Sequence, residues 1–141
     1  MNIQRVSIAV LFVFVFSLLG DALFAHHSAA GYDRDPSHVK KLDGTVVEWR
    51  WTNPHVVLVW DVKDANGKLV RWKGELASPT SMVARGRMTR QSLKFGDHVE
   101  VYVFPEFRGQ PLSIPVRILK DGKMLLNENV RGGGTVFEDD K

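Results

Sequence analysis

The sequence contains no cysteine among its 141 residues. This absence excludes disulfide bonds and a lipid-carrying cysteine, whichever compartment the protein occupies. The stability of the fold must therefore come from a packed core alone. A chain of this length supplies one such core and is too short for two.

Motifs of the common enzyme classes are also absent. No serine lies in a G-x-S-x-G turn, and the sequence has neither an HExxH motif nor a phosphate-binding glycine loop. Charge is balanced, since 19 Lys and Arg stand against 16 Asp and Glu, for a net charge of +3, with no run of five like charges. These features give no support for a catalytic centre and argue against nucleic acid as a partner.

One long hydrophobic run is present, at the N-terminus. It spans residues 6–19, follows a basic residue and leads into a segment with small residues at positions 20–25. This pattern is typical of a secretory signal peptide over residues 1–25, so we expect a periplasmic or secreted protein. We place the cleavage after Ala25, with Ala22 as the alternative. The run is shorter than the roughly 20 residues that span a membrane, and an uncleaved anchor is the remaining interpretation.

Alternating apolar residues follow, which predict strands separated by turns. We expect an N-terminal extension over residues 26–40, a β-barrel domain over residues 41–127 and a flexible tail over residues 128–141. The predicted inward-facing positions of the five strands are Thr45, Val47, Trp49 and Trp51; Val56, Leu58, Trp60 and Val62; Val70, Trp72, Gly74 and Leu76; Val99, Val101 and Val103; and Leu112, Ile114, Val116 and Ile118. Pro115 falls on the outward parity of the fifth strand, which predicts an edge position.

Local signals set the order of the elements. Asn66-Gly67 predicts a hairpin between the second and third strands. Ser78 and Pro79 predict the start of a short helix, with Gly86 at its C-terminal cap. Three strands, one short helix and two further strands follow the order of the OB-fold. We therefore predict an all-β protein with one short helix, built as an OB-fold-like five-stranded Greek-key barrel, with an open β-sandwich as the alternative.

The histidines suggest a metal site. Cleavage after Ala25 would make His26 the mature N-terminus, whose free amine and imidazole form a bidentate chelate. His27 follows directly, and His55 lies in the turn between the first two strands, a loop that borders the usual binding face of OB-folds. Because nitrogen donors in a T-shaped set suit Cu(II), we predict a copper site from His26, His27 and His55.

Other roles stay open. Trp51, Asn53 and Arg50 lie where the first strand ends and form a candidate ligand-binding edge of the barrel. An anion or oligosaccharide would use Arg50, Arg71 or Arg108 together with an exposed aromatic ring. A further alternative is an accessory subunit of an envelope complex, with another envelope protein as its partner. A copper-dependent oxidase is the one enzyme that the histidines motivate.

Short motifs are distributed along the chain after residue 25. They are His26-His27-Ser28, Tyr32-Asp33, Gly44-Thr45-Val46, Trp51-Thr52-Asn53-Pro54-His55, Arg71-Trp72, Glu75-Leu76, Ser78-Pro79, Gly86, Leu93-Lys94 with Gly96-Asp97, and Asp121-Gly122. With these motifs the sequence resembles a family of small exported proteobacterial proteins of unknown function. The resemblance implies a signal peptide followed by one β-barrel-like domain, and it implies no activity. This chain has Met88 where the family tends to have Trp.

Overall fold

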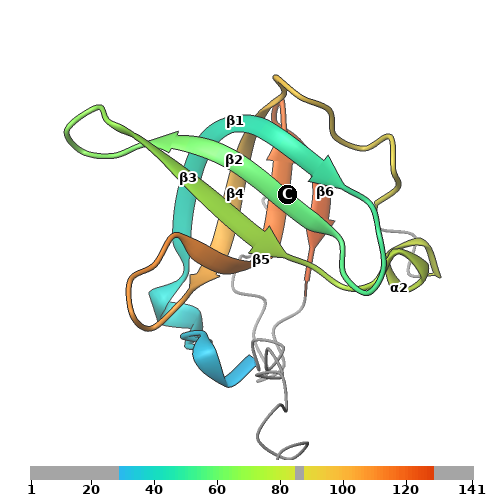
Figure 1. Cartoon of the computed structure of the whole chain (residues 1–141), viewed down its shortest axis with the longest axis horizontal. Helices are drawn as coiled ribbons and strands as arrows, with labels where there is room; N and C mark the ends of the chain where they lie inside the picture. Colours follow the sequence, from blue (N-terminus) through green and yellow to red (C-terminus); the bar gives the residue numbers. More distant parts are fainter. Residues whose placement is uncertain (1–28, 85–87, 129–141) are drawn as a thin grey trace, which may run out of the picture.

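Five strands close into a small barrel in the computed structural model, which describes residues 29–84 and 88–128 (Figure 1). The elements, in chain order, are the 3-10 turns η1 (Ala29–Gly31) and η2 (Pro36–His38), strands β1 (Lys40–Arg50), β2 (Val57–Lys63) and β3 (Leu69–Glu75), helix α2 (Pro79–Ala84), and strands β4 (His98–Pro105), β5 (Leu112–Lys120) and β6 (Lys123–Asn127). The helix falls between β3 and β4, as its capping residues predict.

The order of the strands closes the barrel. The sheet runs β3-β2-β1-β4-β5-β6, and β3 also pairs in parallel with β5, which joins the two ends of a five-stranded ring. The other pairs are antiparallel, and β6 continues beyond β5 as an extra strand. This topology confirms the predicted OB-fold-like barrel and excludes the open β-sandwich.

β1 contains a bulge that changes which of its side chains face the core. The pairing with β2 skips Val47, which is an extra residue on the β1 side. Val46 is consequently buried and Thr45 is exposed. The predicted inward orientation of Thr45 and Val47 is therefore wrong, and Val46 occupies the core instead. Beyond the bulge, Trp49 and Trp51 pack with the core as predicted.

A second bulge lies in β5, where the pairing with β4 skips Val116. Ser113 and Pro115 are buried, whereas Leu112 and Ile114 are only partly buried. The predicted inward parity of Leu112 and Ile114 is therefore wrong, because the extra residue shifts the alternation. The predicted edge position of Pro115 is wrong as well, since β5 pairs with β4 along its length, with β3 at its start and with β6 toward its end.

The inner faces of the second and fourth strands agree with the alternation in the sequence. All of their predicted inward residues are buried, namely Val56, Leu58, Trp60, Val62, Val99, Val101 and Val103. Helix α2 and the segment after it add Met82 and Met88 to this core. The Ser78 hydroxyl accepts a hydrogen bond from the Ser81 N–H at 3.2 Å, which confirms the predicted start of the helix. The predicted cap at Gly86 lies outside the described residues.

A partly buried ion pair joins the turn before β4 to the end of β5. The Asp97 carboxylate accepts a hydrogen bond from the Lys94 N–H at 2.9 Å and pairs with Lys120 Nζ at 2.8 Å. Burial by itself raises the pKa of this carboxyl group, but the hydrogen bonds and charges of Lys120 and Lys94 outweigh burial and lower the pKa below its ordinary value. The fold therefore stabilises the charged form of Asp97.

Replacement of Asp97 should make the stability of the fold less sensitive to acid. A lowered folded-state pKa contributes stability that is present above the unfolded-state pKa, about 3.9, and is lost as pH falls through the folded-state value. We expect the free energy of unfolding, measured by denaturant titration, to fall less below about pH 4 in Asp97→Asn than in the native protein. The exposed Asp43→Asn serves as control. The same acid sensitivity in all three proteins would contradict this assignment.

Gly44, on β1, lies against the backbone of β2. A Cβ atom at this position would collide with the Asp61 carbonyl oxygen and lie 2.8 Å from Trp60 Cδ1. Because a backbone oxygen in a paired strand cannot move aside, we expect Gly44→Ala to destabilise the protein by about 1–3 kcal/mol in thermal melts. Gly31→Ala is the matched control, because a Cβ atom there meets nothing within 4 Å. Similar losses in both variants would argue against packing as the cause.

Candidate functional site

The loop between β1 and β2, residues 51–56, is held against the segment that follows β3. The Val56 N–H donates to the Ala77 carbonyl at 3.1 Å, and the Leu76 N–H donates to the Val56 carbonyl at 2.9 Å. These bonds continue the pairing of β2 with β3 past the ends of the two strands. They place His55, which precedes Val56, beside the Leu76 carbonyl.

His55 has a defined ring orientation. Its Nδ1 atom lies 3.0 Å from the Leu76 carbonyl oxygen. A carbonyl oxygen can only accept a hydrogen bond, so Nδ1 carries the proton, and in the neutral ring Nε2 keeps its lone pair. The side chain is 42% exposed, which leaves the ring accessible from solvent.

Glu75 lies beside the other ring nitrogen, with its Oε1 atom 3.5 Å from His55 Nε2, where the carboxylate forms an ion pair with the ring whenever the ring is protonated. The alternation pattern does not predict the contact, since it marks Glu75 only as an outward-facing position on the third strand. The contact could have been predicted by pairing the residues of the second and third strands outward from the Asn66-Gly67 turn. This register pairs Val57 with Glu75, and Val57 lies two residues after His55. The two side chains therefore form a histidine–glutamate pair that comes from different strands.

The segment before β1 packs on the loop between β4 and β5. Tyr32 forms a β-bridge with Glu106, and the Phe107 N–H donates to the Gly31 carbonyl at 3.1 Å. Burial raises the pKa of the Tyr32 hydroxyl, and the negative charges of Glu75 and Glu106 raise it further. Tyr32 is therefore a neutral hydrogen-bonding group that lies within electrostatic range of Glu75.

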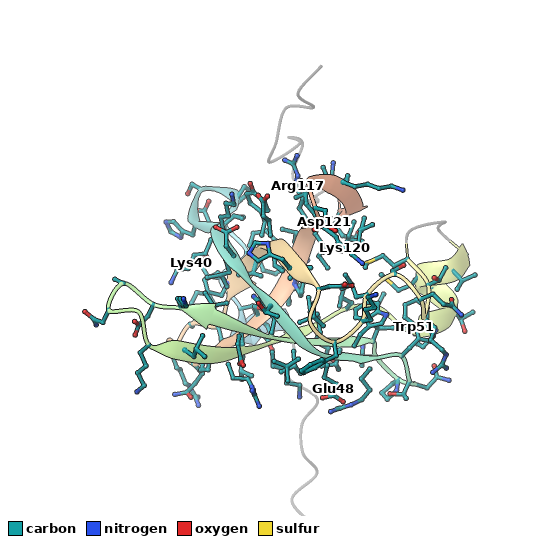
Figure 2. All side chains as sticks on the ribbon, turned by 90° about the horizontal axis from the view of Figure 1, so that it is seen from above. Lys40, Glu48, Trp51, Arg117, Lys120 and Asp121 are labelled. Atoms are coloured by element: carbon teal, nitrogen blue, oxygen red, sulfur yellow. The ribbon has the colours of Figure 1, made fainter. Side chains whose placement is uncertain are left out.

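The residues predicted to form a ligand-binding edge have different surroundings. Trp51 is buried, with its ring centroid 5.6 Å from that of Trp49, and it belongs to the core. Asn53 is exposed in the loop. Arg50 is also exposed, and its Nε and Nη2 atoms donate at 2.8 and 2.9 Å to the carboxylate of Glu48, on the outer surface of the barrel (Figure 2). The structure thus does not bring these three side chains together around one ligand.

The predicted copper ligands lie partly inside and partly outside the described residues. His55 is in place with Glu75 beside it, whereas His26 and His27 lie outside the described residues. Over residues 29–84 and 88–128, no group of three or more His, Cys, Asp or Glu side chains is arranged to hold a metal ion. The pair of His55 and Glu75 supplies two donors, so a complete metal site needs further donors from another part of the chain.

Fold and site together define a small OB-type β-barrel protein with an accessible histidine–glutamate pair beside the loop between β1 and β2. The chain belongs to a family of unknown function, DUF6152, whose sequence profile matches residues 15–114 and so includes both members of that pair. No curated protein and no solved structure matches the chain. In the part of the chain that the structure describes, no helix is long and apolar enough to cross a membrane.

The orientation of His55 predicts a spectroscopic signature. Nitrogen-15 spectra of the neutral imidazole rings should show the Nδ1–H tautomer for His55, because the Leu76 carbonyl accepts its proton. His98, an exposed residue at the start of β4, provides the comparison and should show no such fixed preference. A dominant Nε2–H tautomer at His55 would contradict the assignment.

Proposed function

We propose that this chain is an exported, non-catalytic binding module for a copper ion. The observation that carries the proposal is the His55 ring, whose Nδ1 donates to the Leu76 carbonyl at 3.0 Å while Nε2 faces Glu75 at 3.5 Å. Histidine ligands of metals are usually held in this way, because the hydrogen bond at one ring nitrogen fixes the ring and leaves the other nitrogen to donate its lone pair.

The N-terminal histidines supply the missing donors in this proposal. Cleavage after Ala25 gives His26 a free amine that can chelate a metal together with its own imidazole, and His27 offers a second ring. Cu(II) prefers nitrogen and oxygen donors in a tetragonal arrangement. The amine and ring of His26, the ring of His55 and the carboxylate of Glu75 make up such a donor set.

The path of the described chain supports this combination. His26 lies three positions before Ala29, the first described residue, and extended chain covers about 3.3 Å per residue. Tyr32, three positions further on, forms a β-bridge with Glu106 in the loop that leads into β5, and the start of β5 pairs with β3 next to Glu75. The described chain therefore begins within a few residues of the neighbourhood of Glu75.

A binding role requires less of the site than catalysis does. Binding needs affinity alone, whereas an oxidase also needs an open coordination position and a surface for its substrate. We therefore propose that the protein holds or transfers copper outside the cytoplasm, by itself or with another envelope protein.

Calorimetric titration of Cu(II) into mature protein tests the proposal, after mass spectrometry has verified His26 as the N-terminus. We expect binding of one ion per chain. One additional Ala before His26 should weaken binding strongly, because it separates the terminal amine from the imidazole. His55→Ala should weaken binding less, since a single donor is lost, and Glu75→Gln should weaken it by about tenfold.

His98→Ala is the matched control, because His98 is exposed and lies on β4, outside the proposed donor set. Its affinity for Cu(II) should equal that of the native protein. Equal affinities of the native, Ala-extended and His55→Ala proteins would overturn the proposal. A mature N-terminus at Leu23 would overturn the terminal chelate.

A further inference from the structure

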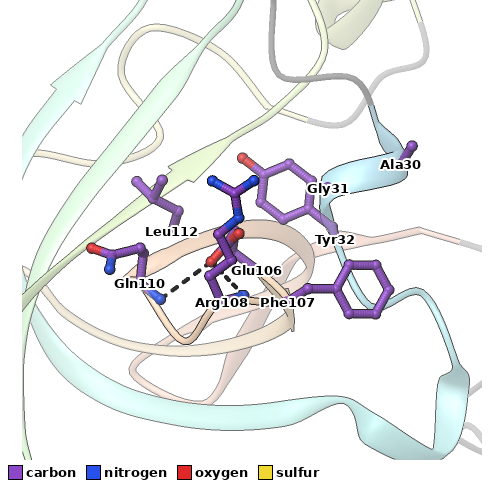
Figure 3. Close-up of a pocket in the computed structure, with 8 residues that line it drawn as sticks. All are labelled: Ala30, Gly31, Tyr32, Glu106, Phe107, Arg108, Gln110 and Leu112. Atoms are coloured by element: carbon purple, nitrogen blue, oxygen red, sulfur yellow. Dashed lines mark hydrogen bonds between the residues drawn. The ribbon is translucent and has the colours of Figure 1, made fainter.

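A pocket of about 380 Å³ opens between the segment before β1 and the loop between β4 and β5 (Figure 3). Its volume lies within the roughly 300–1,000 Å³ of small-molecule sites. Most of its wall is formed by Tyr32, Glu106, Phe107, Arg108, Gln110 and Leu112. Neither His55 nor Glu75 lines this pocket, so it is a second candidate site, separate from the proposed copper ligands.

Glu106 shapes the loop at this pocket. Its Oε2 atom accepts hydrogen bonds from the backbone N–H groups of Arg108 at 2.8 Å and Gln110 at 3.3 Å (Figure 3). Gly109, with a φ of 75°, completes the tight turn between them. These backbone bonds occupy the Oε2 atom of Glu106, and they leave the side chains of Arg108 and Gln110 available at the pocket wall.

Arg108 is the arginine whose guanidinium is available for a ligand, although the Glu106 carboxylate lines the same pocket. Two arginines predicted to bind an anion are occupied, because Arg50 donates twice to Glu48 and Arg71 donates twice to Asp61, all at 2.8–2.9 Å. No ion pair involves Arg108 among the residues that the structure describes. A guanidinium group in this situation favours an anionic ligand, and its planar fork matches a carboxylate.

The other groups of the wall suit the rest of a sugar. The Tyr32 hydroxyl and the Gln110 amide can each donate and accept hydrogen bonds, as sugar hydroxyls require. Phe107 is 65% exposed, and Leu112 is partly buried, so both offer apolar surface to the C–H face of a pyranose ring. One cation, two neutral polar groups and an apolar wall thus surround the same small volume, together with the Glu106 carboxylate, which accepts hydrogen bonds from two backbone N–H groups.

We infer that this pocket binds a small acidic sugar. The sugar carboxylate pairs with Arg108, its hydroxyl groups bond to Tyr32 and Gln110, and its ring lies against Phe107. This function goes beyond the proposed binding of copper, and the two can fail separately, because they depend on different residues.

The probe is D-glucuronate, titrated into the full chain in the presence of a metal chelator and followed by proton–nitrogen NMR. We expect shift changes at Gly31, Gly109 and Leu112, which line or form the pocket. D-glucose lacks the carboxylate and acetate lacks the ring, so each should bind at least about tenfold more weakly than glucuronate.

Two substitutions test the assigned roles. Arg108→Gln should weaken the binding of glucuronate by about tenfold or more, because it removes a charged hydrogen-bonding partner. Phe107→Ala should weaken binding by a smaller factor, because it removes apolar contact area. Arg90→Gln is the matched control, since it removes an exposed arginine that does not line the pocket, and it should leave the affinity unchanged.

A third variant distinguishes the failure of this proposal from the failure of the copper proposal. His55→Ala should bind glucuronate as tightly as the native protein does. The inference is overturned if acetate binds as tightly as glucuronate, if Arg108→Gln keeps the native affinity, or if glucuronate causes no shift at the pocket residues.

Discussion

The barrel depends on a short seam, where β3 meets β5. Lys73 pairs there with Leu112 and Gly74 with Ser113, and the Ser113 hydroxyl donates to the Lys73 carbonyl at 3.4 Å. A side chain at Gly74 would collide with Pro115, so the strands can approach this closely only because Gly74 has none. The seam places the loop that precedes β5 next to β3. Both candidate sites follow from this arrangement, since one lies at that loop and the other at the end of β3.

Regular alternation made the second and fourth strands predictable, together with the order of the elements and the start of the helix. The bulges at Val47 and Val116 were not predictable, because both are ordinary strand residues whose extra place in the pairing depends on the neighbouring strand. The two candidate sites were also only partly predictable, because their residues meet through pairing between different segments. His55 stands out in the sequence as a histidine in a loop, but Glu75 becomes its neighbour through pairing across strands. The pocket at Tyr32 depends on contact between segments far apart in the chain.

Both sites use backbone bonds to position side chains. The Leu76 carbonyl fixes the His55 ring, and the Glu106 carboxylate fixes the loop of Arg108 by accepting from backbone N–H groups. The first bond orients the imidazole ring itself, and the second sets the backbone from which the Arg108 side chain extends. Side chains that are already oriented lose less conformational freedom on binding, which favours affinity. A chain without cysteine thus obtains locally rigid sites from hydrogen bonds.

The seam between β3 and β5 also bears on the order of folding. Ser113 and Lys73 are separated by 40 positions, whereas the hairpins of β1 with β2 and of β2 with β3 join neighbouring segments. Closing the longer loop has the greater entropic cost, so we expect the hairpins to form before the ring closes. The contact of Tyr32 with Glu106 spans a still longer stretch of chain. The pocket is therefore among the last parts of the molecule to assemble, and its occupancy would distinguish completely folded chains from those that have formed only their hairpins.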